Sequence, residues 1–419
     1  MVGNKKKLSS QIFQRFRRII INSIVTKIYK FFFYVLGHLH VNKKLIIFES
    51  FLGKQFSCNP RALYEYIKKN YPDYTLIWSV DKKHINNFLN HDLNYVKRFS
   101  ISWIIAMTKS RYWISNSRLP YWIPKPKHTI YIQTWHGTPL KKLVMDMNEV
   151  HMPGIDIEKY KKDFCQEANK WDYLISPNTY SSEIFSRAFQ FNKTIIESGY
   201  PRNDILHQSI NEKSITNVKL QFGLPENKKV ILYAPTWRDN QFYDQGRYKF
   251  DLNLDLDLLQ RELSEDYIIL LRLHYLVAEN LDLKKYKNFI FDFSNHEDIR
   301  DLYLISDMLM TDYSSVFFDF ANLFRPIIFY VYDLEEYRDK LRGFYFDLEK
   351  NAPGPLVTTT TGIIKSIRAF EANGNKMLEN FSSFYNKFCY LEDGNASRRV
   401  VEAIFSENLA EINNKNEDY

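Results

Sequence analysis

MLMTDYSSVFFDF, at residues 308–320, decides the fold class of this chain. Residues 308–311 form a short apolar run, which is typical of a strand that is buried on both faces of a sheet. A helix is expected to begin near Ser315, a favourable N-cap residue, and to end near Leu323. A strand that leads directly into a helix is the building unit of doubly wound α/β domains.

The same unit repeats on both sides of this segment. Apolar runs that predict strands occur in two groups, at 44–48, 76–80, 112–115, 129–133, 173–176 and 194–197, and at 229–233, 267–272, 289–292, 308–311 and 326–330. The polar residues 202–228 separate the two groups and contain no such run. We therefore expect an α/β protein of the GT-B-like type, in which two doubly wound parallel-sheet domains face each other across a cleft.

Length and charge divide the chain into four regions. Its 419 residues fit two domains, for which we predict the bounds 42–205 and 206–405. Ten of the 57 basic residues and none of the acidic ones precede residue 49, which leaves 47 basic against 49 acidic residues in the rest. Residues 1–41 are predicted to form a basic arm, and residues 406–419 a frayed acidic tail. The nearly neutral body argues against nucleic-acid binding.

Residues 11–36 of the arm have the pattern of an amphipathic helix. No run of 18 uncharged apolar residues occurs, so a membrane-spanning helix is not expected. We favour a helix that lies on an anionic membrane surface, to which each basic residue contributes about 1 kcal/mol. The alternative is a helix that packs on the protein body. The predicted location is the cytoplasmic face of the cell membrane, as a peripheral protein. The apolar side of the helix comprises Phe13, Phe16, Ile20, Ile24, Ile28, Phe31 and Val35.

The turn at residues 311–319 is the first candidate binding site. Ligands of open α/β sheets bind beyond the carboxyl ends of the strands, and the first N–H groups of a helix attract phosphates. Thr311, Ser314 and Ser315 are predicted to contact a pyrophosphate. Asp319, one helical turn further on, is predicted to bond a ribose hydroxyl. The alternative is a capped strand-to-helix turn without a ligand.

QTWHGTPLKK, at residues 133–142, is the second candidate. His136 directly follows a predicted buried strand, and a side chain with a near-neutral pKa can take a proton from an acceptor hydroxyl. Gly137, Thr138 and Lys141 are assigned to the same acceptor side, where Lys141 would attract an anionic acceptor. The alternative is a structural histidine in a tight turn, with solvated lysines beside it.

Two segments of the second half supply further cations. Arg272 and His274, in LRLH at the end of a predicted strand, point to one side and would balance donor phosphates. Their alternative is a polar edge where the chain leaves the sheet. Arg238, in YAPTWRD at residues 233–239, can reach a phosphate, and its alternative is a surface pair with Asp239.

No convincing metal site is found in the sequence. The Asp-Leu-Asp triplet at 255–257 has the form of a metal-binding DxD, but it lies in an alternating Leu/Asp run and is interpreted as solvated surface. Cys58, Cys165 and Cys389 lie far apart and fit neither a zinc site nor a disulfide framework. We predict no certain cofactor and leave a dependence on Mg²⁺ open.

Together these segments resemble the CDP-glycerol glycerophosphotransferase family, whose members build teichoic acids and similar polyol-phosphate polymers. The resemblance covers about residues 45–405 and rests on ordered blocks at 57–64, 133–143, 233–239, 271–274, 311–347 and 393–399. Two departures are minor. Ser57 and Cys58 stand where an acidic residue often precedes Asn-Pro, and the chain lacks the large extra domain of some polymerases.

The resemblance implies a phosphotransferase that moves a polyol phosphate, foremost glycerol phosphate, from a CDP-activated donor to a hydroxyl of a membrane-lipid-linked acceptor and releases CMP. Residues 42–205 would bind the acceptor and residues 206–405 the donor. His136 and His274 carry over as essential histidines, and Ser314 and Ser315 as donor-phosphate contacts.

Three alternatives stay open beside this reaction. The donor could be CDP-ribitol, or the chain could be a GT-B glycosyltransferase that uses a nucleotide-sugar. The presence of both histidines and both serines argues against the third, a scaffold without activity. The expected partners are CDP-glycerol or CDP-ribitol, the lipid-linked acceptor and an anionic membrane surface, but no nucleic acid.

Overall fold

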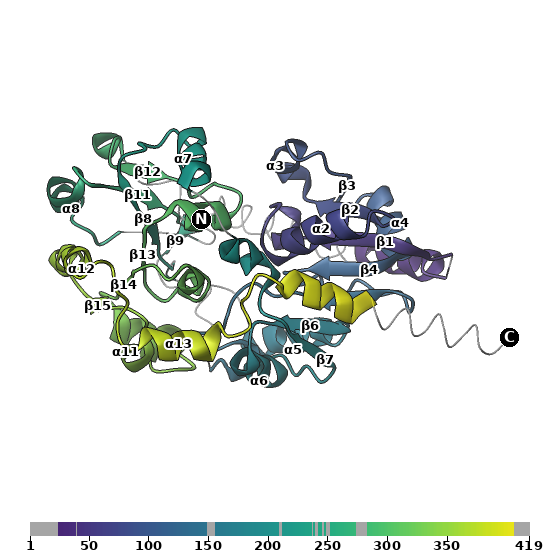
Figure 1. The fold of residues 1–419 in the computed structure, drawn as a ribbon. Helices are drawn as coiled ribbons and strands as arrows, with labels where there is room; N and C mark the ends of the chain where they lie inside the picture. Colours follow the sequence, from purple (N-terminus) through teal and green to yellow (C-terminus); the bar gives the residue numbers. More distant parts are fainter. Residues whose placement is uncertain are drawn as a thin grey trace, which may run out of the picture.

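The computed structural model describes residues 24–38, 40–148, 156–208, 212–236, 238, 242–244, 247–248, 252–273 and 283–405. They form two α/β domains that lie side by side, with the first domain on the right and the second on the left in Figure 1. Each domain is built on its own parallel sheet. The expected GT-B-like α/β class is therefore confirmed.

The first domain contains a seven-stranded sheet in the order β3-β2-β1-β4-β5-β6-β7. Every neighbouring pair is parallel, as in the register of Ile46 with Leu76. The short edge strand β3 is absent from the sequence prediction, which places the other six correctly. The strands are β1 Asn42–Glu49, β2 Thr75–Val80, β3 Tyr95–Lys97, β4 Ser110–Ser115, β5 Ile130–Gln133, β6 Tyr173–Ser176 and β7 Thr194–Glu197.

The second domain contains a six-stranded parallel sheet in the order β12-β11-β8-β13-β14-β15. The antiparallel pair β9 Phe242–Asp244 and β10 Arg247–Tyr248 stands apart from it. This pair and β15 are additions to the predicted strands. The sheet consists of β8 Lys229–Ala234, β11 Tyr267–Leu271, β12 Ile290–Asp292, β13 Met308–Thr311, β14 Ile327–Tyr330 and β15 Leu356–Val357.

Helices connect the strands and cover both sheets. In the first domain they are α2 Cys58–Asn70, α3 Asn86–Leu89, α4 Ile101–Lys109, α5 Ile157–Ala168 and α6 Thr179–Ala188. In the second they are α7 Glu212–Gln221, α8 Leu256–Leu263, α9 Ile299–Ile305, α10 Val316–Phe320, α11 Leu348–Asn351, α12 Thr360–Ala372 and α13 Phe381–Phe388. Residues 24–36 and 396–405 are also helical.

Alternation along the strands gives each sheet two hydrophobic cores. In β1, Ile46 and Phe48 face α2, whereas Leu45 and Ile47 face the core that α4, α5 and α6 complete. In β8, Val230 faces one hydrophobic core of the second domain and Ile231 faces the other. Successive side chains of a strand point to opposite faces, so a continuous apolar run is buried on both sides.

The chain passes between the domains twice. The first passage contains the 3₁₀ segment η4 Pro201–His207, and after the second passage residues 396–405 return to the first domain. This last helix, yellow in Figure 1, buries Val400 and Ile404 against the face of the first sheet that contains Phe48. Asp204 joins the two passages, because its carboxylate accepts the N–H groups of Ala396 and Ser397 at 2.8 Å each.

The N-terminal helix is described from residue 24 onward. Phe33 is buried against Trp103 and Trp113, and Tyr29 packs on Phe99, so one side of the helix docks on the body. Part of the predicted apolar side is exposed instead, comprising Ile24, Ile28, Phe31 and Val35. The predicted helix residues 11–23 lie outside the described residues. Among the described helices, none has the length and apolar character to cross a membrane.

Candidate active site

A cavity of about 630 Å³ lies between the carboxyl ends of the two sheets. The turns after β1, β4 and β5 line it from the first domain, and the turns after β8, β11, β12 and β13 line it from the second. This is the position at which open α/β sheets bind their ligands. Five residues named from the sequence line this cavity together: His136, Arg272, Ser314, Ser315 and Asp319.

His136 lies in the turn after β5, with Trp135 before it in the left-handed region at a φ of 51°. Its Nδ1 lies 2.7 Å from the backbone oxygen of Asn116. A carbonyl oxygen only accepts hydrogen bonds, so Nδ1 carries the proton and Nε2 is left with a lone pair. The indole ring of Trp135 stacks on the imidazole at 4.6 Å and limits its rotation.

The surroundings keep this imidazole neutral. His136 is open to the cleft, but protein atoms surround it on several sides, and this desolvation lowers the pKa of His136 to about 4. The hydrogen bond to Asn116 acts in the opposite direction, and the positive charge of Arg202 lowers the pKa further. A neutral imidazole with a free Nε2 can accept a proton at neutral pH.

Gly137 and Ser315 bring the two domains into contact. A Cβ atom added at Gly137 would lie only 2.8 Å from the Ser315 Oγ. Ser315 stands at the N-cap position of α10, as expected, although its side chain forms no capping hydrogen bond. The helix itself reaches Leu323 as expected, through the 3₁₀ turn η7 Ala321–Leu323. The Ser315 hydroxyl therefore lies beside the turn that carries His136.

Arg272 supplies positive charge to the second-domain wall. Its Nη1 donates to the carbonyl oxygens of Phe293 and Ser294, at 2.7 and 2.8 Å. Within the described residues, no carboxylate lies within ion-pair distance of Arg272. Burial lowers the pKa of Arg272, but an arginine keeps its proton in a protein. Its predicted neighbour His274 lies outside the described residues.

Asp319 lines the cavity and is held by an arginine that sequence reasoning missed. Arg202 donates from Nη2 and Nε to both oxygens of Asp319, at 2.8 and 3.1 Å, and both side chains are buried. Asn203 donates to the same carboxylate at 3.2 Å. The predicted bond from Asp319 to a ribose hydroxyl stays a prediction. Arg202 is the first residue of the polar segment 202–228 and follows Pro201, so no sequence motif marks it as part of a ligand site.

Arg238, Thr311, Thr138 and Lys141 do not line the cavity. Arg238 is buried behind it and pairs with Asp312 at 2.9 Å and with Asp333 at 2.7 Å. Its predicted alternative partner Asp239 lies outside the described residues. The other three are held by the protein itself, with the Thr311 Oγ1 donating to a backbone carbonyl, Thr138 buried and Lys141 in a β-bridge to Phe344.

The side chain of Asn59 joins two segments next to the cavity. The helix α2 begins at Cys58, so Asn59 lies inside the first turn and does not cap it. Its side-chain amide donates to the backbone oxygens of Thr134 and Trp135, and its Oδ1 accepts the N–H of Arg202. This buried amide thus fixes the turn before His136 to the first passage between the domains.

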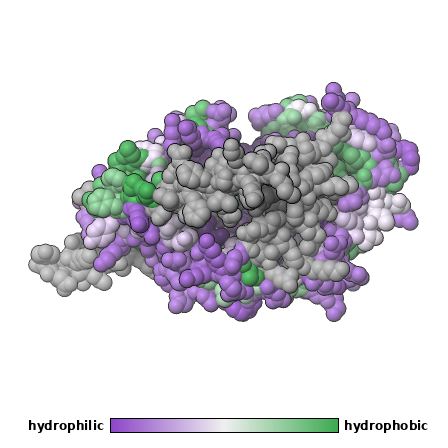
Figure 2. Space-filling model, turned by 180° about the vertical axis from the view of Figure 1, so that it is seen from behind, coloured by the Kyte–Doolittle hydropathy of each residue, from purple (hydrophilic) through white to green (hydrophobic). Residues whose placement is uncertain are grey.

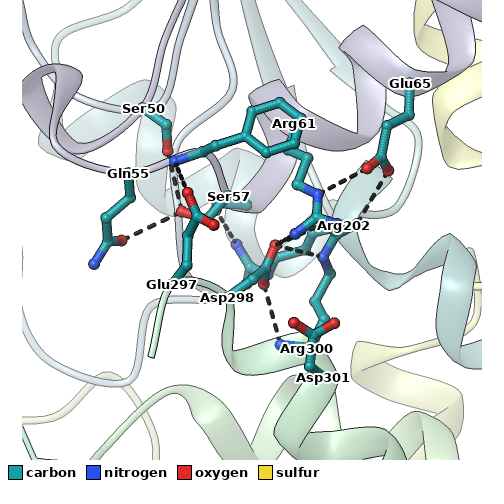
Figure 3. Close-up of polar contacts among 12 residues, drawn as sticks. Ser50, Gln55, Ser57, Arg61, Glu65, Arg202, Glu297, Asp298, Arg300 and Asp301 are labelled. Atoms are coloured by element: carbon teal, nitrogen blue, oxygen red, sulfur yellow. Dashed lines mark hydrogen bonds and ion pairs between the residues drawn. The ribbon is translucent and has the colours of Figure 1, made fainter. Parts of the chain in front are cut away.

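Acidic and basic side chains join the domains at one end of the cleft (Figure 3). Asp298, from the second domain, binds Arg61 of the first at 3.3 Å and Arg300 of its own domain at 2.8 Å. Glu297 accepts the N–H of Phe56 at 3.1 Å and contacts the His91 Nε2 at 2.7 Å. Within the described residues, no group of histidine, cysteine and carboxylate side chains could hold a metal ion.

Comparison with known proteins identifies the family to which this chain belongs. Residues 30–406 match the family described as CDP-Glycerol:Poly(glycerophosphate) glycerophosphotransferase. The chain is 58% identical, over 403 residues, to a teichoic acid poly(glycerol phosphate) polymerase of Bacillus subtilis, with 96% of this chain and 54% of that protein covered. A protein of the same name from Bacillus spizizenii is 57% identical over 399 residues, with 95% of this chain and 100% of that protein covered.

This chain thus spans about half the length of the first relative and the full length of the second. A solved structure of the wall teichoic acid polymerase TagF, in a histidine-to-asparagine variant soaked with CDPG, is similar with a TM-score of 0.85 and 41% identity. The similarity covers 96% of this chain and 98% of that one.

Proposed function

Because this chain belongs to the CDP-glycerol:poly(glycerophosphate) glycerophosphotransferase family, we propose that it transfers glycerol phosphate from CDP-glycerol to an acceptor hydroxyl and releases CMP. The acceptor is the growing or lipid-linked end of a teichoic-acid-type polymer. The first domain, which includes residues 396–405, forms the acceptor side, and the second domain binds the donor. The observation that carries this proposal is the contact of the His136 turn with Ser315 across one cavity.

The chemistry needs a base on one side of the phosphorus and cations around it. His136 Nε2 takes the proton of the acceptor hydroxyl, and the oxygen attacks the phosphorus that carries glycerol. The bond from this phosphorus to the bridging oxygen breaks, and CMP leaves with that oxygen. The new phosphodiester joins the acceptor to the transferred glycerol phosphate.

The second-domain wall is suited to the donor phosphates. Arg272 offers a half-buried charge without a carboxylate partner among the described residues, and Ser314 and Ser315 offer hydroxyl donors. Such groups act most strongly in a site that excludes water, because the local dielectric constant is low. His274 is proposed, from the family resemblance, as a second essential histidine.

The same enzyme is proposed to work as a peripheral protein at the cytoplasmic membrane surface. The helix at 24–36 exposes Phe31 at 62% and Tyr34 at 68% of their side-chain surface, and α4 exposes Ile101 at 78%. Figure 2 shows hydrophobic surface at the left end of the molecule, where the first domain lies in that view. Apolar side chains next to a basic arm suit an anionic lipid surface that carries the acceptor.

Incubation with competing donors tests the function. CDP-glycerol, CDP-ribitol and a nucleotide-sugar are each supplied with a lipid-linked acceptor, with and without Mg²⁺, and nucleotide release is measured. We expect CMP from CDP-glycerol together with a longer acceptor. A faster reaction with CDP-ribitol would support the ribitol alternative. Release of a nucleoside diphosphate from the nucleotide-sugar alone would replace the proposal with a glycosyltransferase.

A further inference from the structure

Asn116 stands at the centre of the first-domain wall and directly follows strand β4. Its backbone oxygen accepts the Nδ1–H of His136 at 2.7 Å. Its side-chain Oδ1 accepts the N–H of Phe51 at 2.8 Å, and its Nδ2 donates to the Ser50 Oγ at 3.1 Å. The Ser117 hydroxyl also donates to the Oδ1 at 3.2 Å. Asn116 is fully buried, so it uses its hydrogen-bonding groups inside the protein.

The turn that this side chain holds has an unusual backbone. Phe51, Leu52 and Gly53 lie in the left-handed region, with φ values of 45°, 64° and 79°. A residue with a side chain costs roughly 1–2 kcal/mol in this region. Such a conformation persists only where the surroundings hold it. The hydrogen bond from Phe51 to Asn116 is one such restraint.

The turn and the base form one continuous surface. The Phe51 ring lies 5.7 Å from the His136 ring, edge to face, and Phe51 and Leu52 line the same cavity as His136. An acceptor hydroxyl that approaches the His136 Nε2 therefore lies next to this turn. The position of the turn decides how closely that hydroxyl can approach the nitrogen.

We propose that Asn116 is a positioning residue for the transfer. Its backbone fixes the His136 ring and its side chain fixes the Phe51–Gly53 turn, so that base and acceptor wall keep one geometry. The inference rests on the proposed function, in which His136 takes the acceptor proton. Proton transfer needs a heavy-atom distance of about 2.6–3.2 Å, and a misplacement of about 1 Å costs about 100-fold in rate.

Two substitutions and a matched control test this role by steady-state CMP release. Asn116→Ala removes the acceptor for the Phe51 N–H, whereas Asn116→Asp keeps it and can accept from Ser50. Asn178 is the control, because it is also buried and caps α6, but its side chain bonds to Phe388 and Ser181 and not to the turns that carry His136 and Phe51. We expect Asn116→Ala to lower kcat about 100-fold at an unchanged KM for CDP-glycerol. Asn116→Asp should recover most of kcat at pH 8, and Asn178→Ala should keep kcat.

The pH profile gives a readout that mere folding support would not change. The charged group that acts on the pKa of His136 is Arg202, which is itself paired with Asp319. A carboxylate at position 116 would stabilise the imidazolium form of His136 and raise its pKa. Because the base must be neutral, the acid limb of the kcat profile should move to higher pH in Asn116→Asp. Asn178→Ala should leave that limb in place.

The outcomes separate the two proposals. Wild-type protein that releases no CMP from CDP-glycerol overturns the proposed function and this inference with it. Active wild type together with an unimpaired Asn116→Ala overturns this inference alone. If Asn116→Ala does not fold, Asn116→Asp decides by its kcat at pH 8, where the base is neutral. Recovery of most of kcat supports the positioning role, and a kcat about 100-fold below that of the wild type contradicts it.

Discussion

Neutral hydrogen bonds hold the turn that carries His136 on the first-domain wall of the cleft, whereas ion pairs of buried arginines hold the second-domain wall. His136 is fixed by the backbone oxygen of Asn116, and the turn before it by the amide of Asn59. Across the cleft, Arg202 pairs with Asp319, and Arg238 pairs with Asp312 and Asp333. The difference suits the proposed chemistry, since a neutral surrounding keeps a base unprotonated and fixed charges suit phosphates.

Removing Arg238 is expected to have the largest effect and to test the charged wall. Arg238→Ala leaves the buried Asp312 and the half-buried Asp333 without their partner, which should lower the free energy of unfolding by about 3–5 kcal/mol. Urea denaturation followed by circular dichroism measures it. Arg338→Ala is the control, because Arg338 pairs with Asp339 and Glu349 at the surface, where an ion pair adds little stability. Equal losses of unfolding free energy in Arg238→Ala and Arg338→Ala would contradict the expected difference between the two sets of ion pairs.

Removing the imidazole tests the neutral wall. His136→Ala should lower kcat by at least about 100-fold, because the acceptor hydroxyl loses its base. In the wild type, kcat/KM should hold steady at neutral pH and fall as the pH approaches about 4, where the imidazole becomes protonated. CMP release across a pH series measures both effects. The control is His128→Ala, since His128 contacts the Thr108 oxygen outside the cavity. Near-normal CMP release by His136→Ala would exclude its role as base.

A methyl group at Gly137 tests the contact between the walls. Gly137→Ala places a carbon 2.8 Å from the Ser315 Oγ, so one of the two turns must shift. Overpacking costs about 1–3 kcal/mol, and 1.4 kcal/mol corresponds to a factor of ten, so we expect kcat/KM to fall about tenfold. The double variant Gly137→Ala/Ser315→Ala relieves the contact. If crowding against the Ser315 Oγ lowers kcat/KM in Gly137→Ala, the double variant should have a higher kcat/KM than the single one. A lower value would show that the loss of the Ser315 hydroxyl has the greater effect.

Glu392, at the hinge that both walls share, should have the smallest effect on the transfer. It accepts from the Tyr200 N–H and from Asn203, and burial raises the pKa of Glu392 to about 8. A folded-state pKa above the unfolded value adds stability at low pH, and this stability is lost as the pH rises toward 8. Unfolding free energies between pH 5 and 8 should therefore fall less in Glu392→Gln than in the wild type.

The exposed Glu226→Gln is the matched control for this slope. The unfolding free energy of Glu226→Gln should have the same pH dependence as that of the wild type, because the substituted side chain lies at the surface in the folded protein. Parallel curves for wild type and Glu392→Gln would show that Glu392 is already ionised in the folded protein. CMP release at pH 7 should be similar for all three proteins.

The sheets could be predicted because continuous apolar runs carry their own signal. The edge strand β3 Tyr95–Lys97 could not, since it is short and only partly buried. Ser315, His136 and Arg272 could be found because each follows the end of a buried strand. Arg238 fits the same rule, but Asp333 lies almost a hundred residues away and binds it behind the cleft. Arg202 and Asn59 act through partners distant in sequence, so no local pattern marks them.

Because residues 396–405 return to the first sheet, the first domain cannot complete its folding before these residues have been synthesised. The second domain is inserted into the first, because residues 396–405 follow the second domain in sequence and cover part of the first-sheet face that contains Phe48. During synthesis, the first sheet therefore leaves the ribosome with one face covered only in part, by α2, until some two hundred further residues have followed. Exposed apolar strands at this stage invite aggregation or chaperone binding. A frameshift or premature stop before residue 396 would leave the first domain incomplete, although its strands are encoded some two hundred residues upstream.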